Sequence, residues 1–325
     1  MTKLRAAAAA LLFVTLLGAA ATWRLADLYV SPGVHAEPVR VLIPRGSGGE
    51  AIADVLAENG AIASAWAFLA GARWDGNLSK LKAGEYAIPA HASAREVAAL
   101  LASGRTVVRR VTLVEGHTSA QILTILRGLE GIEGEPPSPA EGSLLPDTYF
   151  YSWGETRARL LERAARAQRE LLAELWPKRA ADLPFRTPEE ALVLASIVER
   201  ETGHADERSR VAAVFVNRLR VGMRLQADPT VAYGVDPSGP LGRPLSRADL
   251  ENRHPWNTYI HAGLPPTPIA HPGRASIEAV LNPPKTDELY FVADGEGRHV
   301  FARTLPEHNR NVARLREIER ARGQR

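Results

Sequence analysis

The chain has 325 residues, of which 45% are hydrophobic and 24% are charged, and this length and composition exclude a disordered tail protein, a collagen-like fibre and a peptide-sized scaffold. Its 40 Lys and Arg residues are spread along the chain against 37 Asp and Glu residues, so the net charge of +3 does not indicate binding to nucleic acid. The absence of cysteine excludes thiol catalysis, thiolate metal sites and disulfide bonds.

The N-terminal segment predicts a membrane helix. Residues 6–23 form an uncharged run that begins after Arg5 and ends before Arg24. As a helix this run extends about 27 Å, close to the hydrocarbon thickness of a bilayer. It is longer than the apolar core of a typical signal peptide, but the small residues 19–21 leave a cleaved signal peptide as the alternative. Because basic residues precede the run, we expect residues 1–5 in the cytoplasm and the rest of the chain outside.

The next two segments predict a linker and a small folded unit. Residues 24–38 contain a Ser-Pro-Gly turn and are expected to form the linker. Residues 39–105 predict a strand, two helices, a second strand and a third helix. These elements are expected at residues 39–43, 50–58, 64–73, 84–88 and 94–103. Ser93 and Glu96 form a capping box at the start of the third helix.

Residues 106–325 predict a larger domain of mixed helices and strands, so the expected fold class is α+β with an N-terminal transmembrane helix. Helices are expected at about residues 118–129, 155–175, 188–201, 205–220 and 307–322. Strands are expected at residues 107–114 and in a hairpin of residues 289–292 and 299–301. Residues 222–284 are rich in Gly, Pro, Asn and aromatic residues and predict irregular structure with few long periodic runs.

The helix expected at residues 188–201 carries the pattern that is most informative about chemistry. Positions 194, 197, 198 and 201 lie on one face, so Glu201 ends a stripe of otherwise bulky apolar side chains. Burial among apolar groups raises the pKa of a carboxyl, which a general acid on a glycosidic oxygen requires. Glu199 points to roughly the opposite side of this helix. A solvated Glu201 at the helix end is the alternative that the pattern leaves open.

Two segments further along the chain are suited to binding a sugar. Residues 222–230 predict a polar, kinked loop with hydrogen-bonding groups at alternating positions. Residues 256–259 combine an indole, an amide and a phenol, and the proline-rich residues 263–269 restrain the chain beside them. Aromatic rings can stack on sugar rings while amides pair with hydroxyl and acetamido groups. A packed irregular loop whose amides satisfy their own backbone is the alternative.

Other chemistries find little support in the sequence. The histidines show neither HExxH nor another recurrent ligand spacing, so we expect no metal and no cofactor. The sequence contains no G-x-S-x-G nucleophile elbow. The basic helix expected at residues 307–322 is interpreted as a solvated surface and not as a binding site for anions.

Several motifs agree in order and spacing with one known family. Residues 195–202 read ASIVERET, and residues 216–230 contain VNRL followed by MRLQADPT. Further matching segments are residues 82–86, 113–116, 145–149, 257–259, 263–266, 289–292 and 299–301. Together with the N-terminal apolar run, these motifs resemble the MltG/YceG-like endolytic murein transglycosylases over nearly the whole chain.

This resemblance implies a single-pass protein of the inner membrane, with a LysM-like unit at residues 39–105 and a catalytic domain at residues 106–325 in the periplasm. The family cleaves the MurNAc-GlcNAc bond within nascent peptidoglycan strands, leaves 1,6-anhydro-MurNAc ends and thereby terminates strand elongation. Glycan strands are the implied substrate and cell-wall synthases are the implied protein partners. A non-enzymatic, membrane-anchored scaffold that binds peptidoglycan is the alternative function.

The resemblance also implies roles for particular residues. The family's catalytic glutamate corresponds to the second Glu of the Val-Glu-x-Glu motif, which is Glu201, the residue that the apolar stripe also indicates. The residues expected to position the saccharide are Gln226, Asp228, Asn257 and Tyr259. Asp228 and Glu199 are the candidates for a second carboxylate, and a second catalytic carboxylate would instead favour a hydrolase.

Overall fold

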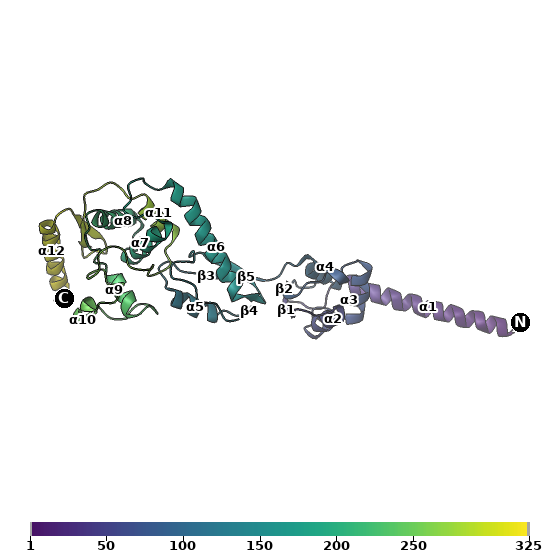
Figure 1. The fold of residues 1–325 in the computed structure, drawn as a ribbon. Coiled ribbons are helices and arrows are strands. Elements are labelled where there is room, and N and C mark those ends of the chain that lie inside the picture. The colour runs from purple at the N-terminus through teal and green to yellow at the C-terminus, as the bar shows by residue number, and fades with distance from the viewer. Residues whose placement is uncertain (1, 324–325) are drawn as a thin grey trace. The chain divides into compact units, whose positions relative to one another are not determined.

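The structure is a computed structural model that describes residues 2–323 of the chain. The chain divides into two compact units (Figure 1). Unit 1 comprises the residues up to Arg109 together with Phe150–Glu155, and unit 2 comprises Arg110–Tyr149 together with the residues from Thr156 on. Helices and short two-stranded sheets together confirm the expected α+β fold class.

Unit 1 begins with the long apolar helix α1 (Thr2–Val30). Its segment Ala7–Val30 is long and apolar enough to cross a membrane, and a signal sequence near an N-terminus would meet the same criterion. The helix continues past Arg24, where the sequence predicted a linker. Two features explain this extension. The first helix-breaking sequence, Ser-Pro-Gly, comes only after Val30, and Arg24 forms an ion pair at 2.9 Å with Asp27 on the next turn.

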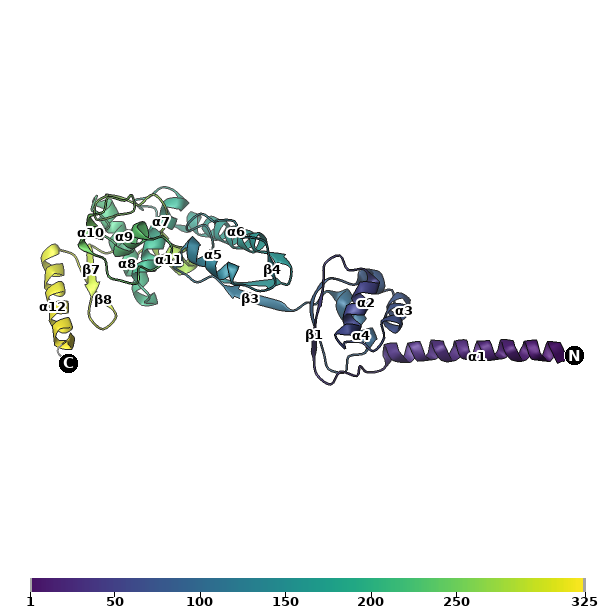
Figure 2. The ribbon, with the colours of Figure 1, turned by 90° about the horizontal axis from the view of Figure 1, so that it is seen from below.

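The rest of unit 1 packs helices against a two-stranded sheet. Its elements are β1 (Val39–Ile43), α2 (Gly49–Glu58), α3 (Ala65–Trp74), the 3-10 turn η1 (Leu78–Lys80), β2 (Gly84–Ile88) and α4 (Ala94–Ser103). Strands β1 and β2 are antiparallel, with Val39 opposite Ile88, and the three helices gather beside them (Figure 2). Phe68, Tyr86 and other fully buried side chains fill the space between the sheet and the helices. The order of elements agrees with the sequence prediction.

Unit 2 contains most of the remaining elements. Its helices and turns are α5 (Ser119–Arg127), α6 (Arg157–Leu175), η2 (Trp176–Lys178), α7 (Pro188–Glu201), α8 (Ala205–Arg220), α9 (Asp228–Val235), α10 (Arg247–Glu251), α11 (Arg274–Leu281) and α12 (Leu305–Gly323). The strand pairs are β3 (Val108–Thr112) with β5 (Thr148–Ser152), β4 (Ile132–Glu133) with β6 (Glu155–Thr156), and β7 (Tyr290–Ala293) with β8 (His299–Ala302). The boundary between the units falls within β3 and β5.

The core of unit 2 lies where α7, α8 and α11 pack together. Helix α7 is buried on all sides from Ala191 to Val198, so only its first and last turns reach the surface. The β7–β8 hairpin forms as predicted, with Phe291 opposite Phe301, and α12 lies beside it (Figure 2). Helices α9, α10 and α11 were not predicted. They are too short to show a clear helical repeat of apolar residues, and prolines and glycines surround them.

Candidate active site

Glu201 is the last residue of α7 and lies where the buried part of the helix meets the surface. The helix begins at a capping box in which Thr187 and Glu190 satisfy each other's backbone amides, with Pro188 at the first helical position. This strong start sets the register that places Glu201 after the buried run ending at Val198. Thr202 ends the helix in an extended conformation.

The Glu201 side chain is half-buried, and its carboxylate has no hydrogen-bond partner among residues 2–323. Burial and, second, the negative charge of Asp228 raise the pKa of Glu201 to about 8, against the opposing positive charge of Arg218. A carboxyl with this pKa carries its proton at neutral pH and can donate it to a leaving oxygen. Glu201 is therefore not the freely solvated helix end that the sequence left as an alternative.

Arg218 is the positively charged residue that lowers the pKa of Glu201. The sequence did not predict it as a site residue. It lies on α8 with 7% of its surface exposed. Its guanidinium donates to the carbonyl oxygen of Leu289 at 2.7 Å and to that of Leu225. Burial lowers the pKa of Arg218 from its usual value. The sequence pattern that could have indicated Arg218 is its position on the same helix face as the buried Val211 and Phe215.

The loop before α9 holds Gln226 in a rare backbone conformation. Gln226 has a φ of 49°, in the left-handed region that favours glycine. The backbone amide of Gln226 donates to the Thr258 carbonyl oxygen at 3.2 Å, and the backbone amide of Ala227 donates to the Thr258 hydroxyl at 3.0 Å. The Thr258 hydroxyl also pairs with that of Thr230 at 2.8 Å. These bonds fix the two sugar-binding segments predicted from the sequence to each other and leave the Gln226 side chain exposed.

Asp228 and Tyr259 form the second half of the site. Tyr259 donates its hydroxyl proton to Oδ1 of Asp228 at 2.5 Å. Burial, followed by this hydrogen bond and the charge of Asp228, raises the pKa of Tyr259 above its usual value. Asp228 is the first residue of α9, where a carboxylate is favoured by the helix dipole. Its charge also acts on Glu201, so Asp228 links the acid on α7 with the phenol of Tyr259.

Asn257 lies behind this group and is fully buried. Its side-chain amide donates to the carbonyl oxygens of Leu250 at 2.9 Å and Asn252 at 2.7 Å, and its Oδ1 accepts from the Tyr259 amide at 2.9 Å. Both ends of the amide are thus used by the protein itself. The Asn257 side chain is therefore held by these backbone groups next to Tyr259, and its expected contact with the sugar stays a prediction.

Glu199, the other candidate carboxylate, points elsewhere. Its Oε2 accepts from the backbone amide of Gly273 at 2.9 Å, and Oε1 lies 3.9 Å from the Arg208 guanidinium. Glu115 approaches the same glycine so closely that a Cβ at position 273 would lie 1.8 Å from its Oε1. Glu199 and Glu115 thus meet at the start of α11, and burial and the charge of Glu199 raise the pKa of Glu115.

The histidines do not assemble a metal site within residues 2–323. His271 is fully buried between Ser119, whose hydroxyl lies 3.0 Å from Nε2, and the Leu144 amide, which donates to Nδ1 at 3.1 Å. Burial lowers the pKa of His271 to about 4, so the ring is neutral. Its hydrogen bonds join three segments that are distant in the sequence.

Comparison with known proteins identifies the family to which the chain is related. A model of the YceG-like family matches residues 41–314. The chain is 32% identical over 304 residues to a Bacillus subtilis protein named endolytic murein transglycosylase, covering 84% of this chain and 83% of that protein. It is 29% identical to proteins of the same name from two Streptococcus pneumoniae strains, and the match spans 58% of their length and 85% of this chain. A crystal structure of a yceG-like protein from Listeria monocytogenes has a TM-score of 0.51 at 28% identity, covering 85% of this chain and 99% of that one.

Proposed function

The chain belongs to the YceG-like family, and on that premise we propose that it is a lytic transglycosylase that cleaves peptidoglycan strands internally. The observation that carries this proposal is the single carboxyl with a pKa of about 8 at the end of α7. Relatives named endolytic murein transglycosylase match most of the chain. The substrate is the glycan strand of peptidoglycan.

The proposed reaction needs one carboxyl because the substrate supplies its own nucleophile. Glu201 donates its proton to the glycosidic oxygen as the bond from the MurNAc anomeric carbon to the GlcNAc oxygen breaks. The 6-hydroxyl of the same MurNAc then bonds to the anomeric carbon, and Glu201 takes up the hydroxyl proton. The products are a free GlcNAc 4-hydroxyl and a 1,6-anhydro-MurNAc end, and no water is consumed. Attack within one sugar ring gains the proximity advantage of an intramolecular reaction.

We assign the neighbouring residues to support of this step. The Asp228 side chain faces the positive charge that develops at the anomeric carbon, and Tyr259 holds it by their hydrogen bond. The exposed side-chain amide of Gln226 is free to hydrogen-bond a substituent of the sugar. Asn257 positions Tyr259 by accepting a hydrogen bond from its backbone amide. Glu199 is occupied by Gly273 and Arg208, so Asp228 is the better candidate for a second carboxylate.

Analysis of the cleavage products tests the proposal. Peptidoglycan sacculi digested with the protein should release muropeptides whose MurNAc ends are anhydro forms by mass spectrometry. Glu201→Gln should keep the fold and lower the cleavage rate by about 10²–10⁴-fold, the usual contribution of a general acid-base. Reducing MurNAc ends would instead show hydrolysis and give Asp228 the role of a base or nucleophile. Intact sacculi after incubation with the wild-type protein would favour the scaffold function.

We further propose the cellular setting implied by the N-terminal half. Helix α1 anchors the protein in the inner membrane, with residues 1–5 in the cytoplasm and the catalytic domain of residues 106–325 in the periplasm. Helix α1 runs to Val30, and its Tyr29 is buried in the core of unit 1, which supports an anchor over a cleaved signal peptide. Residues 39–105 act as a LysM-like unit, and cell-wall synthases are the partners that would supply nascent strands.

A further inference from the structure

Helix α3 presents an unusual face to solvent. Trp66 and Trp74 are 81% and 92% exposed, whereas Phe68 on the opposite side is fully buried. Ala70 and Arg73 are exposed between the two tryptophans. The spacing of positions 66, 70, 73 and 74 puts all four on one side of the helix, which we call the α3 face. Two exposed indoles on one short helix form an apolar surface that a purely aqueous protein rarely keeps.

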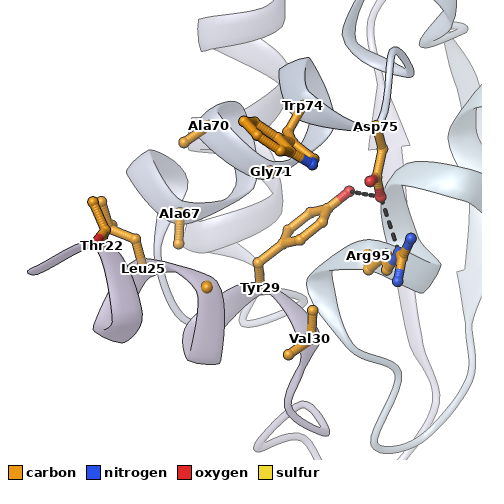
Figure 3. A pocket seen from close by; sticks show the side chains of 11 residues that line it. Thr22, Leu25, Tyr29, Val30, Ala67, Ala70, Gly71, Trp74, Asp75 and Arg95 are labelled. Carbon is orange, nitrogen blue, oxygen red and sulfur yellow. Dashed lines mark hydrogen bonds and ion pairs between the residues drawn. The ribbon is translucent and has the colours of Figure 1, made fainter. Parts of the chain in front are cut away.

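An open cavity of about 460 Å³ lies along the contact between α3 and the last turns of α1 (Figure 3). Leu25 and Val30 of α1 line it on one side, and Ala70 and Trp74 of α3 line it on the other. Arg95 lies at one end of the cavity and keeps 61% of its side chain exposed. The cavity is thus largely apolar along its walls and carries the ion pair of Arg95 and Asp75 at one end.

The end of α1 is fixed to α3 by Tyr29. The Tyr29 ring packs onto Gly71, where a Cβ would lie 2.3 Å from the ring, so the contact requires glycine. The Tyr29 hydroxyl donates to the Asp75 carboxylate at 3.1 Å, and the Arg95 guanidinium donates to the same carboxylate at 2.9 Å (Figure 3). Because these contacts hold α3 beside α1, the depth of α1 in a membrane also sets the depth of α3.

The position of α1 places the cavity at the level of the lipid headgroups. Its uncharged run ends at Trp23, so the hydrocarbon ends near Arg24, and tryptophan is enriched at this boundary. The following residues to Val30 rise about 9 Å further, which slightly exceeds the roughly 5–7.5 Å thickness of one headgroup layer. Leu25, Val30 and their neighbour Trp74 therefore lie within or next to that layer.

We propose that the α3 face is a membrane-surface site, inserted in the headgroup layer of the bilayer that α1 crosses, and that a phospholipid fills the cavity between α1 and α3. Tryptophan prefers this layer because it places an apolar ring and one N–H donor at the boundary. Arg73 and Arg95 face the lipid phosphates, while acyl and glycerol carbons cover the apolar walls. The inference rests on the proposed membrane anchor and goes beyond the proposed reaction, because it seats unit 1 on the membrane surface.

The cysteine-free chain allows a direct test by single labels. Trp74→Cys, Leu42→Cys and Leu12→Cys are each made in the full chain, labelled with an environment-sensitive fluorophore and reconstituted in vesicles of phosphatidylethanolamine and phosphatidylglycerol. Leu42 is the matched control, because it is 38% exposed on β1, where its buried neighbours Val41 and Ile43 point to the opposite face of the sheet. Leu12 reports the membrane span and is 60% exposed.

We expect labels at positions 74 and 12 to lose emission with brominated phospholipids and to resist aqueous iodide, while the label at position 42 shows the reverse. If position 74 behaves like position 42 while position 12 is quenched by the lipids, the α3 face is not a membrane surface although α1 is an anchor. If no label is quenched by the lipids, the anchor and the α3 face are both refuted. The anhydro-muropeptide assay is independent of each outcome.

Discussion

At the scale of single residues, the site depends on the protonated state of Glu201. Burial raises the pKa of Glu201 most, and two charges then act on it in opposite directions, because Asp228 raises it and Arg218 lowers it. The sequence revealed Glu201 through the apolar stripe of its own helix. It could not reveal that Arg218 acts on Glu201, because contacts between separate helices leave no periodic signal. Asn257 illustrates the same limit, since its burial depends on the Leu250 and Asn252 carbonyls.

The pH dependence of cleavage should report the pKa of Glu201. We expect the rate at low substrate to fall as pH rises above about 8, because Glu201 then loses the proton it donates. Asp228→Asn removes the charge that raises this pKa and should move the fall to lower pH by about one unit. Tyr259→Phe keeps the Asp228 charge and is the control that should leave the fall in place. Rates of anhydro-muropeptide release across pH check this, and an unmoved fall in Asp228→Asn would contradict it.

The same pKa predicts a change in stability. The pKa of Glu201 is about 8 in the folded chain against its ordinary 4.5, so within this window the folded state binds more protons. The free energy of unfolding should therefore fall as pH rises from about 4.5 through about 8. Glu201→Gln removes this loss and should stabilise the protein by on the order of 2 kcal/mol at alkaline pH, with no such gain below the ordinary pKa. Thermal unfolding against pH measures it, and a gain that does not depend on pH would contradict the assignment.

Glu189→Gln is the matched control for this measurement. Glu189 lies on the same helix but in its exposed first turn. Its replacement should change stability by only a few tenths of a kcal/mol through the helix dipole, and by a similar amount at both ends of the pH range.

At the scale of elements, local signals explain what the sequence could predict. Helix α7 was predicted with its correct end because a capping box and a proline mark its start and a regular apolar pattern follows. Helix α11 was missed although Ile277, Val280 and Leu281 are fully buried. Its start at Gly273 has no side-chain cap, and its position is fixed instead by the Glu199 carboxylate on that glycine's amide. A tertiary contact takes the place of the missing local signal.

The strained loop before α9 allows a test that separates structure from function. Gln226→Gly should raise stability by about 1 kcal/mol, because glycine adopts a positive φ without the steric cost of a Cβ. It should nevertheless slow cleavage, because the side-chain amide offered to the sugar is lost. Gln226→Ala is the control, which loses the amide but keeps the strain and gains no such stability. Chemical denaturation and muropeptide release measure the two effects, and full activity in both variants would remove Gln226 from the substrate site.

At the scale of the whole molecule, the two units have separate hydrophobic cores. Phe68 is fully buried in the core of unit 1, and Phe215 is fully buried in the core of unit 2, against α7 and α11. The clusters that contain them share no residue. Unit 1 extends to Arg109, and Phe150–Glu155 joins it from within the later sequence. The domains expected at residues 39–105 and 106–325 stay a prediction. No pattern in residues 150–155 indicates this return.

Separate cores should unfold separately. Phe68→Ala leaves a cavity that costs about 3–5 kcal/mol, and we expect it to lower only one of two calorimetric transitions of the full chain in detergent. Phe215→Ala should lower only the other transition, and it should also reduce cleavage because Phe215 lies one helical turn from Arg218. Glycan cleavage by Phe68→Ala should remain at the wild-type rate below its lowered transition. A single transition that shifts with either substitution would show instead that the two units unfold together. Unfolding of unit 1 would then also unfold the part of unit 2 that contains the catalytic residues.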